Sequence, residues 1–170
     1  MLDIGANTGE FSLLSAACGA RVVAIDRDPE MAGAIWRAAN ADVLPLVVDF
    51  GRPTPPAGWR GREHAGFLER AEGQFDCVLM LALIHHLLVS ERIPLDQILE
   101  TAAGLTSRCL AVEYVGPENP LFRRMARGRK ELDGWQMRAV FEECARAHFE
   151  IAGAFETAEF RVPYFLRRKA

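Results

Sequence analysis

The stretch MLDIGANTGEF (residues 1–11) joins a short apolar run to two closely spaced glycines, and this combination indicates the fold class. Gly5 and Gly9 stand directly after that run, and helix-like sequence follows them. Glycine lets the backbone turn sharply and lets a ligand approach it closely. In an open α/β sheet, ligands bind outside the carboxyl ends of the strands. The stretch therefore predicts a first strand, a ligand-binding turn and a first helix.

The spacing of the turn bears on the kind of ligand. It reads G-x-N-x-G, whereas the dinucleotide fingerprint G-x-G-x-x-G uses its middle glycine to make room for a pyrophosphate. Asn7 stands in the place of that glycine. The turn therefore favours a nucleoside without phosphates over NAD.

Apolar runs of strand length alternate with helix-like segments along the rest of the chain. Near-continuous apolar strands are typical of a parallel sheet that is covered on both faces. The alternation of strands and helices predicts a doubly wound α/β sheet. The strand-like runs cover residues 21–25, 43–48, 75–81 and 108–115, and the helix-like segments cover 9–19, 29–40, 94–105 and 134–149.

The C-terminal part predicts a reversed last strand. Two strand-like runs, 149–156 and 159–169, are joined by the dipeptide TA. So short a link cannot hold a crossover helix, so neighbouring strands joined by it run antiparallel. We therefore expect a Rossmann-like, doubly wound sheet that is mostly parallel and has an antiparallel last strand.

The composition predicts a single globular domain. The chain has 170 residues, of which 50% are hydrophobic and 25% charged, and its net charge is -3. This charge argues against binding to nucleic acids or membranes through overall charge. The most apolar stretch, residues 78–89, contains two histidines and is too short to span a bilayer.

The cysteines stand singly at positions 18, 77, 109 and 144, without a CxxC unit. Scattered cysteines in apolar surroundings are typical of reduced core thiols, because thiols stay reduced inside the cell. We therefore expect a cytoplasmic protein.

Three aspartates stand at the ends of the first three predicted strands. Asp26 follows Gly5 by 21 residues, where a carboxylate can accept hydrogen bonds from the hydroxyl groups of a ribose. Asp49 is followed by Phe50, and this pair suits the edge and face of an adenine. Asp3 suits an ammonium group. Three carboxylates on one rim favour a cationic ligand over a polyphosphate.

These motifs resemble the class I S-adenosylmethionine-dependent methyltransferases. LDIGANTGEFS (2–12), VVAIDRDP (22–29) and FDCVLMLALIHHL (75–87) carry the resemblance. A narrower resemblance, to a bacterial group that includes a host-specific nodulation protein, is carried by residues 47–71, 84–100 and 111–125.

The resemblance implies a seven-stranded sheet with a reversed last strand and S-adenosylmethionine as the cofactor. The residues that it places around the cofactor are Asp3, Gly5, Asn7, Gly9, Asp26 and Asp49. Members of the group usually carry a segment before the glycine turn, whereas four residues precede Gly5 here. We therefore expect that the domain lacks an N-terminal segment and that uncovered apolar surface favours self-association.

The candidate catalytic residues are His85, His86 and Glu113, which follow or end the later strands. A histidine titrates near neutrality and can take the proton of an acceptor. The sulfonium of the cofactor is already activated, so orientation alone can suffice. The residues favour the alternatives, which are a structural role for the histidines and a salt bridge for Glu113. We see no clear third ligand that would make the histidine pair a metal site.

The whole sequence favours methyl transfer to a small or medium-sized metabolite, without a membrane partner. Residues 81–86 lack a (D/N)-P-P-(Y/F) motif, which counts against methylation of exocyclic amines in nucleic acids. The basic run at 123–130 is typical of a solvated helix face, although RNA contact would also suit it. Three competing interpretations stay open: a truncated or non-catalytic S-adenosylmethionine-binding domain, an RNA methyltransferase and an NAD-dependent oxidoreductase.

Overall fold

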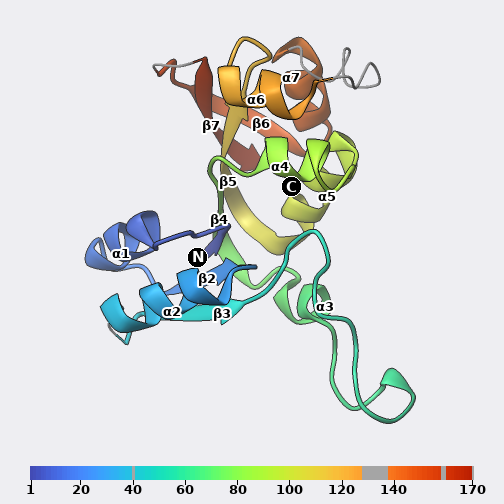
Figure 1. The fold of residues 1–170 in the computed structure, drawn as a ribbon. Coiled ribbons are helices and arrows are strands. Elements are labelled where there is room, and N and C mark those ends of the chain that lie inside the picture. Colours follow the sequence, from blue (N-terminus) through green and yellow to red (C-terminus); the bar gives the residue numbers. More distant parts are fainter. Residues whose placement is uncertain (40, 128–137, 158–159, 170) are drawn as a thin grey trace.

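A seven-stranded sheet forms the centre of the computed structural model, which describes residues 1–39, 41–127, 138–157 and 160–169 (Figure 1). The strands are Leu2–Ile4 (β1), Val22–Asp26 (β2), Val43–Val47 (β3), Phe75–Met80 (β4), Thr106–Val115 (β5), Phe149–Ala154 (β6) and Arg161–Arg168 (β7). Their order is β3-β2-β1-β4-β5-β7-β6. β7 pairs antiparallel with β5 and β6, while the pairs among β1 to β5 are parallel. The expected Rossmann-like sheet with an antiparallel last strand is confirmed.

The longer predicted helices are present. The helices are Glu10–Ala17 (α1), Pro29–Ala38 (α2), Phe67–Ala71 (α3), Ile84–Val89 (α4), Leu95–Leu105 (α5), Pro120–Met125 (α6) and Arg138–His148 (α7), with a 3₁₀ turn at Trp59–Gly61. Residues 134–137 of the predicted last helix and 128–130 of the basic run lie outside the described residues. The sequence did not predict α3 and α4, and it marked α6 only where the basic run at 123–130 overlaps its end, because five or six residues are too few to display a helical repeat. None of the helices in the described ranges is long and apolar enough to cross a membrane.

Both faces of the sheet are covered. Successive side chains of a strand point to opposite faces, and β2 shows the consequence. Val22 and Ala24 pack in a cluster with Ile35 of α2, whereas Ile25 belongs to the larger cluster that contains Leu99 of α5. The near-continuous apolar strands therefore reflect burial on two sides, as their pattern predicts.

The strand register brings the ends of several strands to one edge of the sheet. Parallel pairing places the carboxyl ends of β1, β2, β4 and β5 together. β7 runs in the opposite direction, so its first residue, Arg161, pairs with Val115 at the end of β5. This edge is where a doubly wound sheet binds ligands.

A long connection between β3 and α3 projects away from the sheet (Figure 1). It contains the 3₁₀ turn and a single bridge between Ala57 and His64. Trp59 in this projection is 78% exposed. Residues 52–66 line neither of the two cavities described below.

The cysteines are free, as the sequence predicted, but they are less buried than core thiols, and only Cys144 packs against the main core cluster in the described residues. All four are free, Cys18 is exposed, and Cys77, Cys109 and Cys144 are partly exposed. Cys18 follows α1 directly as its C-cap residue, so it stands at the end of a helix and outside the core.

His85 is a polar residue that α4 buries in the core. Its exposed fraction is 3%, it lies beside Tyr114 and Phe141 at a very small cavity, and its Nδ1 has no hydrogen-bond partner among the described residues. Burial first, and then the charges of His86 and Arg161, lower the pKa of His85 from 6.5 to about 4. His85 is therefore neutral in the folded protein at neutral pH.

We predict that the free energy of unfolding decreases as the pH falls from about 7 to about 4.5. The unfolded chain takes up a proton on His85 near its ordinary pKa of 6.5, whereas the folded chain resists that proton until about pH 4. Stability is therefore lost as the pH falls through this window, and His85 accounts for about 2 kcal/mol of the loss. Denaturant unfolding of the native chain and of His85→Gln at both pH values measures the contribution of His85. All other titrating groups are common to the two proteins, so their contributions cancel in the comparison. An equal pH dependence in the two proteins would contradict it.

Candidate functional site

The turn between β1 and α1, residues 5–9, contains three residues with positive φ. Gly5, Asn7 and Gly9 have φ angles of 75°, 48° and 83°, in the region that favours glycine. The backbone N–H groups of Gly5 and Ala6 both donate to the carbonyl oxygen of Ile25, at 2.9 and 3.0 Å. The turn therefore lies against the carboxyl end of β2.

Close packing excludes larger side chains from this turn. A Cβ atom at Gly9 would lie 2.8 Å from Cγ1 of Ile35, and one at Gly5 would lie 3.2 Å from Cδ1 of Leu83. Real Cβ atoms essentially never approach another atom as closely as the first of these distances. Glycine at position 9 thus lets α1 begin directly beside α2.

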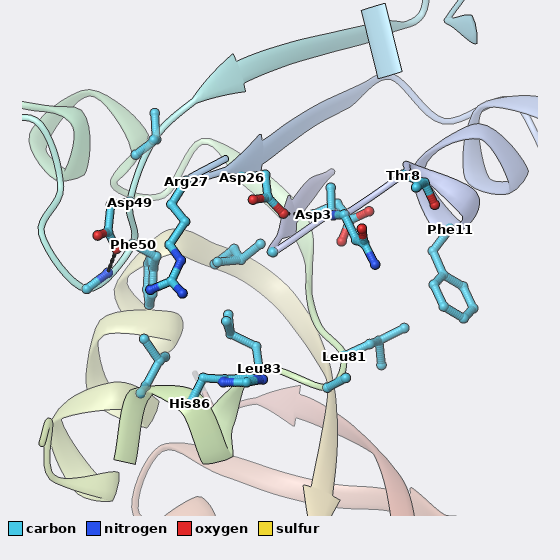
Figure 2. Close-up of a pocket in the computed structure, with 18 of the residues that line it drawn as sticks. Asp3, Thr8, Phe11, Asp26, Arg27, Asp49, Phe50, Leu81, Leu83 and His86 are labelled. Atoms are coloured by element: carbon cyan, nitrogen blue, oxygen red, sulfur yellow. Dashed lines mark hydrogen bonds between the residues drawn. The ribbon is translucent and has the colours of Figure 1, made fainter. Parts of the chain in front are cut away.

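Asp26 holds the turn in place from the end of β2. Its Oδ2 accepts a hydrogen bond from the backbone N–H of Asn7 at 2.8 Å, and its Oδ1 accepts one from Asp28 at 2.9 Å. A carboxylate has about four acceptor positions, so each oxygen retains one for a ligand. Asp26 lines the cavity described next, where Figure 2 shows it near Asp3.

A cavity of about 410 Å³ opens at the carboxyl edge of the sheet. Small-molecule sites usually measure roughly 300–1,000 Å³. In Figure 2, Asp3 and Asp26 lie on one side of the cavity, while Leu83 and His86 lie on the other. The predicted cofactor residues that line it are Asp3, Gly5, Asn7, Asp26, Asp49 and Phe50. Gly9 does not line the cavity and acts on it through the shape of the turn.

Asp3 is buried beside the glycine turn, with 4% of its surface exposed. The Ser12 hydroxyl donates to its Oδ2 at 2.5 Å. Burial, aided by the charge of Asp26, raises the pKa of Asp3, and the hydrogen bond from Ser12 opposes the shift. A cation bound in the cavity would favour the ionised form of this carboxyl.

Asp49 and Phe50 reach the cavity from the loop after β3. Asp49 Oδ1 accepts a hydrogen bond from the backbone N–H of Gly51 at 2.9 Å, drawn as the dashed line in Figure 2. Phe50 packs partly buried against the main core cluster. The loop thus offers a carboxylate and an aromatic ring side by side.

The cavity also contains residues that the sequence did not predict. They are Ile4, Ala6, Thr8, Glu10, Phe11, Arg27, Val48, Gly51, Leu81, Ala82, Leu83, Leu87 and Glu91. Thr8 and Arg27 are neighbours of predicted residues, so proximity in sequence could have found them. Leu83 and Glu91 flank α4 and lie beside Gly5 and Gly51 respectively, and no sequence motif marks these contacts.

Acidic side chains dominate the charged lining, with Arg27 as its cation. The carboxylates are Asp3, Glu10, Asp26, Asp49 and Glu91. Glu91 pairs with Arg27 at 3.6 Å and with Arg52 at 3.2 Å, so its charge is compensated. The remaining excess of carboxylates suits a ligand with a positive charge and disfavours a polyphosphate.

The two adjacent histidines have different positions. His86 lines the cavity, whereas His85 lies in the core. Burial first, and then the positive charge of Arg27, lower the pKa of His86. His86 therefore presents a neutral imidazole to the cavity at neutral pH.

Glu113 does not line the cavity but supports one wall of it. Its Oε2 accepts hydrogen bonds from the backbone N–H of Ala82 and from Nη1 of Arg161, both at 3.0 Å. The salt bridge that the sequence left open for Glu113 is therefore present. Among the described residues, no group of three or more His, Cys, Asp or Glu side chains could hold a metal ion.

We predict that Gly9→Ala destabilises the fold more than Gly19→Ala. Both glycines have positive φ, which costs an L-residue roughly 1–2 kcal/mol. An added Cβ at Gly19 meets nothing within 4 Å, whereas one at Gly9 collides with Ile35, and overpacking costs roughly 1–3 kcal/mol more. Denaturant unfolding of both variants measures the difference, and equal losses of stability would refute the crowding argument.

Comparison with known proteins identifies the family of the chain. Residues 1–161 match a family model described as a methyltransferase domain. Nodulation protein NoeA from Rhizobium meliloti (strain 1021) is 32% identical over 136 residues, which is 78% of this chain and 28% of that protein. The chain thus spans less than a third of the length of this relative.

Solved structures share the fold. Magnesium protoporphyrin IX methyltransferase (ChlM) from Synechocystis PCC 6803, crystallised with bound SAH, is 19% identical with a TM-score of 0.63, covering 99% of this chain and 73% of that one. PH0226 from Pyrococcus horikoshii OT3 is 16% identical with a TM-score of 0.64, covering 99% and 81%. The bifunctional kinase-methyltransferase WbdD is 21% identical with a TM-score of 0.61, covering 98% and 34%.

The resemblance that the motifs suggested is thereby confirmed. The family match runs over almost the whole chain and includes the glycine turn, Asp26 and the β4–α4 segment that together form the cavity. The chain belongs to the methyltransferase-domain family.

Proposed function

We propose that this chain binds S-adenosylmethionine in the cavity beside the 5–9 turn and transfers its methyl group to a small or medium-sized acceptor. The observation that carries the proposal is Asp26, whose two oxygens are oriented by backbone N–H groups and line the cavity. The family match supports it. The ChlM structures with bound SAH and SAM support it further, because they share the fold.

The donor set of the cavity fits such a ligand in three parts. Asp26 would accept hydrogen bonds from the ribose hydroxyls. Asp49 and Phe50 would contact the edge and face of the adenine, and Asp3 would meet the ammonium group of the methionine part. These residues line one cavity from the ends of three neighbouring strands.

The chain's own residues would contribute orientation and charge. When bound, S-adenosylmethionine supplies a methyl group on a positively charged sulfonium. The acidic lining favours a ligand with positive charge, and holding two reactants in line can supply a large part of a rate enhancement. Leu81 and Leu83 provide apolar surface on the side of β4 and α4.

His86 is the residue in this cavity best suited to accept a proton. Its neutral imidazole lines the wall opposite Asp26 (Figure 2). A general base needs both an unprotonated form and a position near the acceptor. His85 lacks the second condition, because it faces the core.

We predict that Asp26→Asn weakens binding of S-adenosylhomocysteine at least tenfold. The change removes the negative charge of the Asp26 side chain. Hydrogen bonds to a charged acceptor contribute about 1.5–3 kcal/mol each, and those to a neutral amide contribute less. The amide oxygen can still accept from the N–H of Asn7, whereas the amide nitrogen cannot accept from the N–H of Asp28, so a melting curve of the variant checks that the fold is retained. Calorimetric titration measures the affinity, and unchanged affinity would remove Asp26 from the binding site.

The matched control for this experiment is Asp28→Asn. Asp28 caps α2 by accepting from the N–H of Glu30 and does not line the cavity. Its replacement should leave the affinity unchanged. In the native chain, S-adenosylhomocysteine at 100 times its dissociation constant should stabilise the fold by about 2.7 kcal/mol. Stabilisation by NAD instead would overturn the proposed function.

We predict that His86→Ala lowers the turnover number less than tenfold and leaves the affinity for S-adenosylhomocysteine unchanged. The sulfonium is already activated, so orientation carries most of the transfer. Release of S-adenosylhomocysteine with a panel of small acceptors measures turnover, and His64→Ala, in the projecting loop, is the control. A hundredfold loss at unchanged melting temperature would instead assign base catalysis to His86.

A further inference from the structure

A second cavity, of about 680 Å³, lies beyond β5 on the same edge of the sheet. It forms where β5 and β6 end and where β7 and α7 begin, in the upper part of Figure 1. Its lining includes Tyr114, Glu118, Arg138, Glu156, Phe160 and Arg161. Both cavities therefore open at the carboxyl edge.

Glu113 connects the walls of the two cavities. The same carboxylate oxygen accepts from the N–H of Ala82, which lines the first cavity, and from Nη1 of Arg161, which lines the second. Ala82 has a φ of 51°, which is uncommon for a residue other than glycine. Glu113 is therefore a positioning residue, since it holds both the turn after β4 and the guanidinium of Arg161.

Arg161 keeps part of its hydrogen-bonding capacity unused. Its Nη1 bonds Glu113, but its Nε is buried and has no partner among the described residues. The side chain as a whole is 27% exposed. A buried donor without a partner is unfavourable, and a ligand acceptor would remove that penalty if the partly exposed side chain rotates this N–H toward the cavity.

Arg138, the other cation of this cavity, is already engaged. Its Nε donates to the hydroxyl of Tyr164 and to Glu142, and its Nη1 donates to Glu156. The charge of Glu156 is thereby compensated at the cavity. Arg161 is also paired, with Glu113, but it keeps an Nε without a partner among the described residues, so a further anion would bind at Arg161.

We infer that the second cavity binds the methyl acceptor and that Arg161 recognises a carboxylate on it. The inference rests on the proposed function. A guanidinium offers parallel N–H groups that match a planar carboxylate. Tyr114 and Phe160 offer aromatic surface for the body of the acceptor. Glu118 at the cavity repels any anion, and it repels a doubly charged phosphate more strongly than a singly charged carboxylate.

Benzoate and benzamide are the probes, because they have nearly the same shape and differ in charge. Each is titrated calorimetrically into the full chain saturated with S-adenosylhomocysteine, so that the first cavity is filled. We expect benzoate to bind at least tenfold more tightly than benzamide. Equal binding of the two probes, or no binding of benzoate, would overturn the inference.

Three variants locate the binding. Arg161→Gln should abolish the preference for benzoate, while Arg167→Gln, on the same strand with its side chain 66% exposed and paired with Glu150, should retain it. Ala139→Trp fills the second cavity from an exposed position and should abolish benzoate binding. This variant keeps the inference testable if Arg161→Gln does not fold. A preference that survives both changes would refute the inference.

The outcomes separate the two proposals. If the native chain binds S-adenosylhomocysteine but not benzoate, the proposed function stands and the acceptor site is wrong. If S-adenosylhomocysteine does not bind, the proposed function fails and the assignment of the second cavity fails with it.

Discussion

The hydrogen bond from the N–H of Asn7 to the carboxylate of Asp26 is the contact on which the ligand-binding edge depends. It ties a turn with three positive φ angles to the end of the neighbouring strand. Two further N–H groups of the turn bond the carbonyl of Ile25. Together these bonds stabilise a backbone that would otherwise be strained. They also orient Asp26 toward the cavity, so the same contacts that hold the turn form one wall of the site.

The edge gathers carboxylates that repel one another. Asp3 is desolvated there, and the charge of Asp26 makes its ionisation harder still. Arg27 relieves part of this repulsion through its pair with Glu91. A ligand with a positive charge would relieve more, so ligand binding should stabilise the fold through the same electrostatic interactions that select the ligand.

The antiparallel direction of β7 extends this edge. Because β7 begins where β5 ends, Arg161 lies at the same side as the carboxyl ends of the parallel strands. Glu113 then pairs with Arg161 and bonds Ala82. A parallel β7 would place Arg161 at the far edge, and neither the link through Glu113 nor the second cavity would form.

Local patterns in the sequence were enough to predict the alternation of strands and helices, the reversed last strand, the glycine turn and most of the acidic rim, because these depend on local periodicity, turn chemistry and strand ends. The positions of His86 at the cavity, of His85 in the core and of Glu113 between two walls follow from the packing of the folded chain. Those positions depend on a short helix without a visible repeat and on contacts between residues 31 and 48 positions apart in sequence. Contacts at such separation arise from packing of the whole sheet, which local pattern does not encode.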